Sequence, residues 1–337
     1  MKNATTAPKL ALNKETAKTV GKALTREYSF VLSFIVLVII GACVNRNFFT
    51  WNNISNLFVQ GCMIGLISMG MTMVIGAGLI DISVGSQVAL VGGFGILVLN
   101  ATNSVLAMLA FCVVGGLIIG LINGLLVTKG GMPPMVATLA TMSAARAIIN
   151  YYGAGGPFTV SKANYDSFRQ LAVGGIKLGE KFKLPYLMII FIVAVIIFDI
   201  VMKKTALGKH IFAVGSNEKS ARLSGINVDL TKIATYMVTG AMCGVAAVIY
   251  ASRMTAVASA SAAVGWEMDA IAAVAIGGTS MTGGRGKIWG TFLGVLMFRI
   301  ISNILTAVNV SSYLNGAISA AIIVLAVLMQ NFQNKRR

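Results

Sequence analysis

Long hydrophobic runs alternate with short polar segments between residues 29 and 332. A helix needs roughly 20 apolar residues, each adding about 1.5 Å, to cross the hydrocarbon core of a bilayer. The pattern therefore predicts an all-α, polytopic integral membrane protein with about ten transmembrane helices, of which the two shortest are also compatible with half-spans. These helices are predicted near residues 29–45, 55–77, 82–99, 104–127, 135–152, 185–202, 232–251, 264–279, 288–306 and 313–332.

The most polar interruption runs from Gly208 to Val228, between two of these hydrophobic runs. It is too polar to cross a bilayer and too short to form a domain. Six basic residues lie in it or beside it, and residues 217–223 have the composition of a short helix. Because Lys and Arg gather on the cytoplasmic side of membrane proteins, we predict a cytoplasmic loop at about 203–231. A helix held there between two spans could let a cytoplasmic machine act on the bundle.

Charge distribution predicts the topology. With ten crossings and a cytoplasmic N-terminus, 18 of the 27 Lys and Arg residues fall on the inner face. The expected regions are a cytoplasmic segment 1–28, a transmembrane domain 29–332 with an outer loop at about 153–184, and a basic cytoplasmic tail 333–337. The net charge of +17 is then a sign of topology and of attraction to anionic lipid, and not of nucleic-acid binding.

Composition supports the membrane assignment and limits the chemistry. Hydrophobic residues make up 57% of the chain and charged residues 11%, so the chain has more apolar surface than a soluble domain could bury. It has one histidine, His210, and no spacing typical of a metal site or a catalytic triad. A glycine-rich run at 283–287 lacks the first glycine and the final Ser or Thr of a phosphate-binding loop. ATP, if it drives this protein, is therefore expected to be bound by another polypeptide.

Glycines predict how the spans pack. Gly116, Gly120 and Gly124 lie on one helix face at four-residue spacing, and the pairs 61/65, 240/244 and 290/294 repeat that spacing. Small residues on one face allow two helix backbones to approach closely, and this interpretation is favoured over a role in lining a pore. Asn123 lies beside the ladder and could form a hydrogen bond between helices.

Asp81 is the carboxylate most expected within the membrane, since the other nine lie in loops or near span ends. Carriers coupled to protons or sodium usually need buried ionisable groups along their path, so this class is poorly supported. Asp81 lies in the glycine-interrupted segment 76–85, where a break in the helix is expected. Two alternatives stay open: Asp81 and Ser83 form part of a polar pathway or gate, or they cap the third helix.

Three separated motifs carry a resemblance to a known family. They are GLIDISVG at 78–85, then VGSN at 214–217 with ARLSGINV at 221–228, then EMDAIAAV at 267–274 followed by IGGTS at 276–280 and GGRG at 283–286. In this order they resemble the permeases of ribose-type bacterial ATP-binding-cassette (ABC) sugar importers, over nearly the whole chain. The sequence departs from the family pattern at a few positions, among them Glu218 and Arg299. These departures do not change the predicted class of protein, but they leave open which sugar it transports.

The resemblance implies an ABC importer permease fold, no catalytic residue, metal or cofactor in this chain, and a location in the bacterial cytoplasmic (inner) membrane with both termini inside. The implied partners are an ABC ATPase subunit that binds ATP and Mg, an extracytoplasmic sugar-binding protein, a second permease copy (as homodimer or heterodimer), membrane lipid and the sugar itself.

The resemblance and the predicted topology together assign three groups of candidate site residues. ATPase coupling is assigned to Gly215, Asn217, Glu218, Ala221, Arg222, Leu223, Ser224 and Gly225. The pathway or gate is assigned to Asp81, Ser83, Gly85 and Asn123. Docking of the binding protein is assigned to Arg46, Arg253, Glu267 and Asp269, where Arg253 could instead pair with one of the two carboxylates.

The function predicted from sequence is therefore import of a monosaccharide, ribose-like or similar, driven by a separate ATPase and fed by a solute-binding protein. An ion-coupled secondary carrier or channel is the alternative, and a membrane enzyme is disfavoured by the missing catalytic set. The spans offer few polar groups, so the isolated permease is expected to bind sugar more weakly than roughly 1 mM, equivalent to about 4 kcal/mol.

Overall fold

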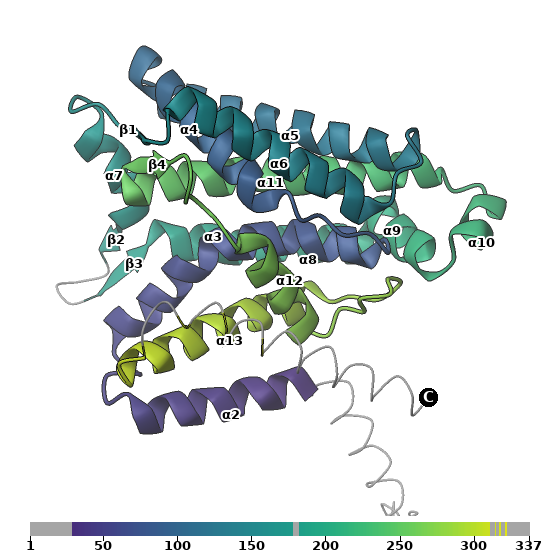
Figure 1. Ribbon diagram of the computed structural model, residues 1–337. Coiled ribbons are helices and arrows are strands. Elements are labelled where there is room, and N and C mark those ends of the chain that lie inside the picture. The colour runs from purple at the N-terminus through teal and green to yellow at the C-terminus, as the bar shows by residue number, and fades with distance from the viewer. Residues whose placement is uncertain (1–28, 178–181, 311–313, 315–316, 318–320, 322–337) are drawn as a thin grey trace, which may run out of the picture.

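The computed structural model describes residues 29–177 and 182–310, together with residues 314, 317 and 321. The predicted segment 1–28, most of the tenth hydrophobic run and the tail 333–337 lie outside this part of the chain. The described residues form a bundle of helices with two small strand pairings, which confirms the all-α polytopic prediction (Figure 1). Its helices are α2 (Ser29–Val44), α3 (Trp51–Gly76), α4 (Val84–Thr102), α5 (Val105–Thr128), α6 (Pro134–Gly153), α7 (Tyr165–Val173), α8 (Tyr186–Lys204), α9 (Ala206–Ser216), α10 (Glu218–Leu223), α11 (Val228–Met254), α12 (Trp266–Ile276) and α13 (Ile288–Ala307).

Six of these helices are long and apolar enough to cross a membrane, namely α3, α4, α5, α8, α11 and α13. The predicted runs at 29–45 and 135–152 correspond to α2 and α6, and the run at 264–279 contains only the 11-residue α12. At about 1.5 Å per residue, α12 covers roughly half of a bilayer. It is therefore a half-span, as its length in the sequence allowed.

The strands lie at one end of the bundle, which we call the strand end (Figure 1). There β1 (Pro157–Thr159) pairs antiparallel with β4 (Ala256–Ala258), and β2 (Gly175–Lys177) pairs antiparallel with β3 (Lys183–Pro185). Helix α7 lies at the same end, whereas α9 and α10 lie at the opposite end, which we call the α10 end. The segment 153–184 thus has its own secondary structure at the strand end.

The glycine ladder holds α5 against α11, which confirms the packing prediction. A Cβ atom added at Gly116 would collide with the backbone of Gly240, and one added at Gly120 would collide with the backbone of Tyr236. At Gly124 the added atom would lie 2.8 Å from Cα of Ile233. Real Cβ atoms do not approach so closely, so only glycine permits this helix separation. Gly294 packs in the same way on Ala273 of α12, and Gly290 packs on Gly277 just after α12.

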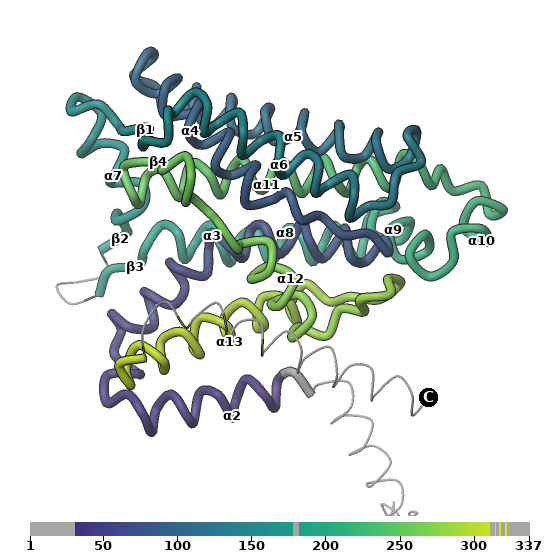
Figure 2. Tube along the Cα trace, viewed as in Figure 1, coloured from purple at the N-terminus to yellow at the C-terminus, as the bar shows by residue number. Residues whose placement is uncertain are grey.

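Two non-helical segments pass through the bundle. Residues 77–83 separate α3 from α4, and Gly78 adopts φ +76° there, which confirms the predicted break. The second segment leaves β4 at the strand end and runs inward to α12 (Figure 2). Glu267 and Asp269 lie in the first turn of α12. The docking assignment places these two carboxylates at the outer face, whereas α12 begins inside the bundle.

Candidate functional site

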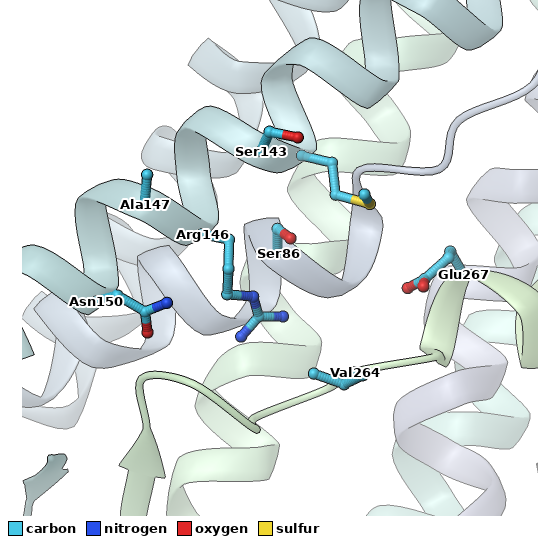
Figure 3. Close-up of a pocket in the computed structure, with 8 residues that line it drawn as sticks. Ser86, Ser143, Arg146, Ala147, Asn150, Val264 and Glu267 are labelled. Carbon is cyan, nitrogen blue, oxygen red and sulfur yellow. The ribbon is translucent and has the colours of Figure 1, made fainter. Parts of the chain in front are cut away.

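A cavity lined by both polar and apolar side chains lies where α4, α6 and the start of α12 meet (Figure 3). Its volume is about 430 Å³, within the range of about 300–1,000 Å³ typical of small-molecule sites. Helix α6 contributes one face, because residues 143, 146, 147 and 150 follow the three- and four-residue spacing of neighbours along a helix. The lining residues are Ser86, Met142, Ser143, Arg146, Ala147, Asn150, Val264 and Glu267.

Arg146 of α6 forms hydrogen bonds with the segment that precedes α12. Its Nη1 atom donates hydrogen bonds to the carbonyl oxygens of Ser259 and Ala262, each 3.0 Å long. Those carbonyls belong to a non-helical stretch inside the bundle, where backbone groups need a partner from the protein or from water. These two hydrogen bonds therefore hold the segment before α12 beside α6, and Figure 3 shows the Arg146 side chain extending from α6 toward Val264.

Glu267 closes the opposite side of the cavity, against the start of α4. A Cβ atom at Gly85 would lie 2.7 Å from its Oε2 atom and would also collide with the carbonyl oxygen of Ala263. Gly85 thus allows the first turns of α4 and α12 to meet closely. Broken helices that begin inside a membrane bundle commonly form solute sites, because their free backbone N–H groups face the cavity.

Asn150 supplies a polar atom that the protein does not use. Its Oδ1 atom is buried and has no hydrogen-bond partner among the described residues. A buried polar atom left without a partner costs about 1–3 kcal/mol, and Asn150 is one of the residues that line the cavity. Ser143, Ala147 and Val264 are exposed, which connects the cavity to the molecular surface.

The residues assigned to the pathway form a buried network beside this cavity. Asp81, Ser83 and Asn123 are fully buried. The Ser83 hydroxyl donates to Oδ1 of Asp81 and accepts from Nδ2 of Asn123 at 2.9 Å. Thr141 of α6 donates to Oδ1 of Asn123 at 2.7 Å, and Gln87 donates to the Ser83 hydroxyl at 2.8 Å. This network joins α4, α5 and α6. The fourth assigned residue, Gly85, packs against Ala263 and Glu267.

The capping alternative for Ser83 is wrong. Ser83 occupies the N-cap position of α4, but its side chain makes no capping hydrogen bond, because the hydroxyl is directed to Asp81. The backbone N–H of Ser83 donates to Oδ1 of Asp81 at 2.8 Å, while Oδ2 of Asp81 has no partner among the described residues.

The residues assigned to coupling lie at the α10 end. Asn217 caps α10 by accepting a 2.9 Å hydrogen bond from the Ser220 N–H, which confirms the short helix predicted at 217–223; α9 was not anticipated. Ala221 packs α10 against Val214 and Val228. Ser224 and Gly225, with φ +81° at Gly225, form the turn after α10.

Charged side chains connect α10 to its neighbours. Arg222 contacts Asp229 at 3.2 Å and Glu218 at 3.6 Å, Lys232 contacts Glu218 at 2.8 Å, and Lys129 contacts Asp229 at 2.8 Å. Leu223 stands outside this network and is 90% exposed. An open cavity of about 540 Å³ is lined by Glu218, Lys219, Arg222 and Leu223.

The three sequence motifs converge near the α10 end. A Cβ atom at Gly215 would collide with the carbonyl oxygen of Gly76 and would lie 2.7 Å from the N atom of Gly284. The Gly284 N–H donates to that same carbonyl at 2.9 Å. The end of α9 is thus in direct contact with the end of α3 and with the loop 277–287. These contacts give a short physical route from α10 to the break before α4.

The residues assigned to docking differ in their exposure and in their partners. Arg46 is exposed in the turn between α2 and α3, at the strand end. Arg253 is half-buried near the end of α11, and its Nη1 atom has no hydrogen-bond partner among the described residues. The pairing of Arg253 with Glu267 or Asp269 is not observed. Instead Asp269 pairs with Arg299 of α13 at 3.7 Å.

Sequence reasoning missed Ser86, Ser143, Arg146 and Asn150 as site residues. Arg146 could have been identified from the sequence, because placing an arginine inside a membrane span costs free energy and such residues usually belong to a functional site. Asn150 gave none, since only the structure shows that its oxygen lacks a partner. Among the described residues, no group of three or more His, Cys, Asp or Glu side chains could hold a metal ion.

The fold and the site define a class: a multi-pass membrane permease with an open cavity between α4, α6 and α12 and a helical surface at one end. Residues 53–327 match the family described as "Branched-chain amino acid transport system / permease component". The chain belongs to this family and, within it, is a permease of the ribose type of ABC sugar importer.

Similar proteins align over nearly their full length. The ribose import permease RbsC of Haemophilus influenzae is 35% identical, with 94% of this chain and 97% of the relative covered. RbsC of Bacillus subtilis is 39% identical, with 88% and 90% covered. The galactose/methyl galactoside import permease MglC of Escherichia coli is 31% identical, with 97% and 99% covered. No solved structure gives a significant match.

Proposed function

We propose that this chain moves a monosaccharide across the bacterial cytoplasmic membrane as the permease subunit of an ABC importer, with a separate ATPase supplying the energy and a solute-binding protein delivering the sugar. The observation that carries the proposal is the full-length similarity to import permeases for ribose, arabinose and galactose. The absence of a catalytic set in the sequence fits a subunit whose ATP and Mg are bound by its partner.

The surface around α10 supports the proposed ATPase contact. Leu223 is 90% exposed beside the charged side chains of Arg222 and Glu218. An exposed apolar anchor with a charged rim has the arrangement of residues found at protein interfaces. Contacts from Gly215 to the loop 277–287 then provide a path by which movement of α10 reaches the bundle.

The strand end is the proposed landing surface for the sugar-binding protein, and a second permease copy is proposed to complete the pathway. With α10 in the cytoplasm, the strand end faces outward and presents Arg46 to a partner with acidic lobes. Opposite charges on two such surfaces steer their association and fix their orientation. The distribution of Lys and Arg supports the proposed cytoplasmic placement of both termini.

A branched-chain amino acid is the second candidate solute, because the family description names that class and because the cavity carries both an arginine and a carboxylate. The relatives favour sugar, since those that align along this chain most extensively are sugar import permeases.

The test reconstitutes the permease in lipid vesicles with its ATPase and binding protein. We expect ATP-dependent uptake of radiolabelled ribose, arabinose or galactose, and ATP hydrolysis stimulated by the loaded binding protein. Arg222→Glu should abolish the stimulation while the permease still inserts. Uptake that continues without the ATPase would instead favour an ion-coupled carrier, and uptake of leucine alone would favour the amino-acid alternative.

A further inference from the structure

We infer that the cavity between α4, α6 and α12 is the permease's own sugar site, at which Arg146, Asn150 and Glu267 bind the hydroxyl groups of the monosaccharide during transit. This inference rests on the proposed function and deepens it, since it assigns solute contacts to Arg146 and Asn150, which no sequence motif identifies, and to Glu267, which the sequence assigned to docking.

The chemistry of the cavity fits an uncharged polyol. A sugar hydroxyl both donates and accepts, so it needs acceptors as well as donors around it. Glu267 supplies carboxylate oxygens, Asn150 supplies an oxygen without a protein partner, and Arg146 supplies guanidinium N–H groups beyond the Nη1 atom used by the backbone. The formal charges of Arg146 and Glu267 cancel, so a net charge on the solute would not strengthen its binding to the site.

The apolar part of the lining fits the other face of a sugar. Met142, Ala147 and Val264 alternate with the polar side chains around the same cavity. Binding sites combine such an apolar lining with a few placed polar groups that fix the orientation of the ligand. The opening past Ser143 leaves the site accessible, which favours weak, short-lived binding over capture.

The position of the cavity gives such a site a role. Glu267 lies in the first turn of α12, and the loop that follows α12 contacts Gly215 at the end of α9. Movement at the α10 end can therefore reach the cavity through one short helix. A solute held there while the binding protein opens is less able to return outward, so the site should determine how many sugars cross for each ATP hydrolysed.

Asn150→Leu is the decisive substitution. It replaces an unpartnered buried oxygen by an apolar group of similar size, which should leave folding unchanged or improved. In vesicles containing the complete transporter, we expect stimulated ATP hydrolysis within twofold of the natural protein and at least a tenfold loss of ribose taken up per ATP. Ile148→Leu introduces the same residue on α6 outside the cavity and should leave that ratio unchanged. A ratio within twofold of the natural protein in Asn150→Leu would overturn the inference.

Direct binding is measured by protection of a thiol. Ser143→Cys, in a chain whose exposed Cys43 is replaced by Ala, should react with N-ethylmaleimide at least threefold more slowly in 50 mM D-ribose. The protection should disappear when Asn150→Leu is added. Equal labelling with and without ribose, or protection by 50 mM L-leucine but not by ribose, would refute a sugar site. Failure of the proposed function is distinguishable, because the natural transporter would then show no stimulated hydrolysis at all.

Discussion

The buried ion pair between Asp269 and Arg299 gives a prediction with a calculable size. Asp269 lies in α12 and Arg299 in α13, their side chains are 23% and 15% exposed, and the nearest N and O atoms are 3.7 Å apart. Nε and Nη2 of Arg299 have no hydrogen-bond partner among the described residues. Asp269 is therefore the main compensation for a buried cation, and Asp269→Asn removes it.

The magnitude follows from the separation. Two unit charges 3.7 Å apart attract by about 4.5 kcal/mol at an effective dielectric constant of about 20. Removing one partner of a buried pair typically costs about 3–5 kcal/mol, because the remaining charge stays buried without compensation. Replacing both partners by uncharged side chains avoids this cost. We expect Asp269→Asn to destabilise the permease by about 3–5 kcal/mol, and the double variant Asp269→Asn with Arg299→Met to lie within about 1 kcal/mol of the natural protein.

The assay is unfolding of the purified permease by SDS in mixed micelles, followed by tryptophan fluorescence. The double variant Asp269→Asn with Arg299→Met should recover most of the loss, since the isolated buried cation is gone. Asp199→Asn is the matched control: Asp199 pairs with Lys203, whose side chain is 63% exposed, and the expected cost is below about 1 kcal/mol.

Two outcomes would refute this reasoning. Equal, small costs for Asp269→Asn and Asp199→Asn would mean that Arg299 reaches solvent. Additive effects in the double variant would mean that the two side chains do not interact.

Four further predictions concern other parts of the molecule. Leu223→Glu should lower binding-protein-stimulated ATP hydrolysis at least tenfold without affecting insertion, and unchanged stimulation would remove α10 from the proposed interface. Gly240→Leu should prevent close packing of α5 on α11 and abolish recovery of monodisperse permease, whereas Gly156→Ala, at a loop glycine, should not. Arg46→Glu should weaken capture of the binding protein, more strongly at low salt; a capture constant independent of ionic strength would exclude steering. Calorimetry of the isolated permease should give a ribose Kd above roughly 1 mM, and micromolar binding would contradict the open, weak site.

The sequence by itself determined the membrane class, the positions of most helices and the family. A hydrophobic run of about 20 residues in a bilayer must form a helix, because only a helix gives the backbone N–H and C=O groups of a single run their hydrogen-bond partners. Local chemistry also predicted the short helix at 217–223, the break in the segment 76–85 and the close packing at Gly116, since each depends on residues near one another in the chain or on a small side chain at a fixed spacing.

Only the tertiary structure decided which polar side chains share a cavity. Arg146 and Glu267 are 121 positions apart, and nothing in either segment shows that α12 begins inside the bundle beside α6. The structure also enclosed Asp81 in a network with Asn123 and paired Asp269 with Arg299. Such pairings depend on how whole helices pack against one another. Lipid and the protein interior are almost equally apolar, so the hydrophobic effect does not select which helices pack together inside a membrane. Shape complementarity and small residues scattered along the helices decide it instead.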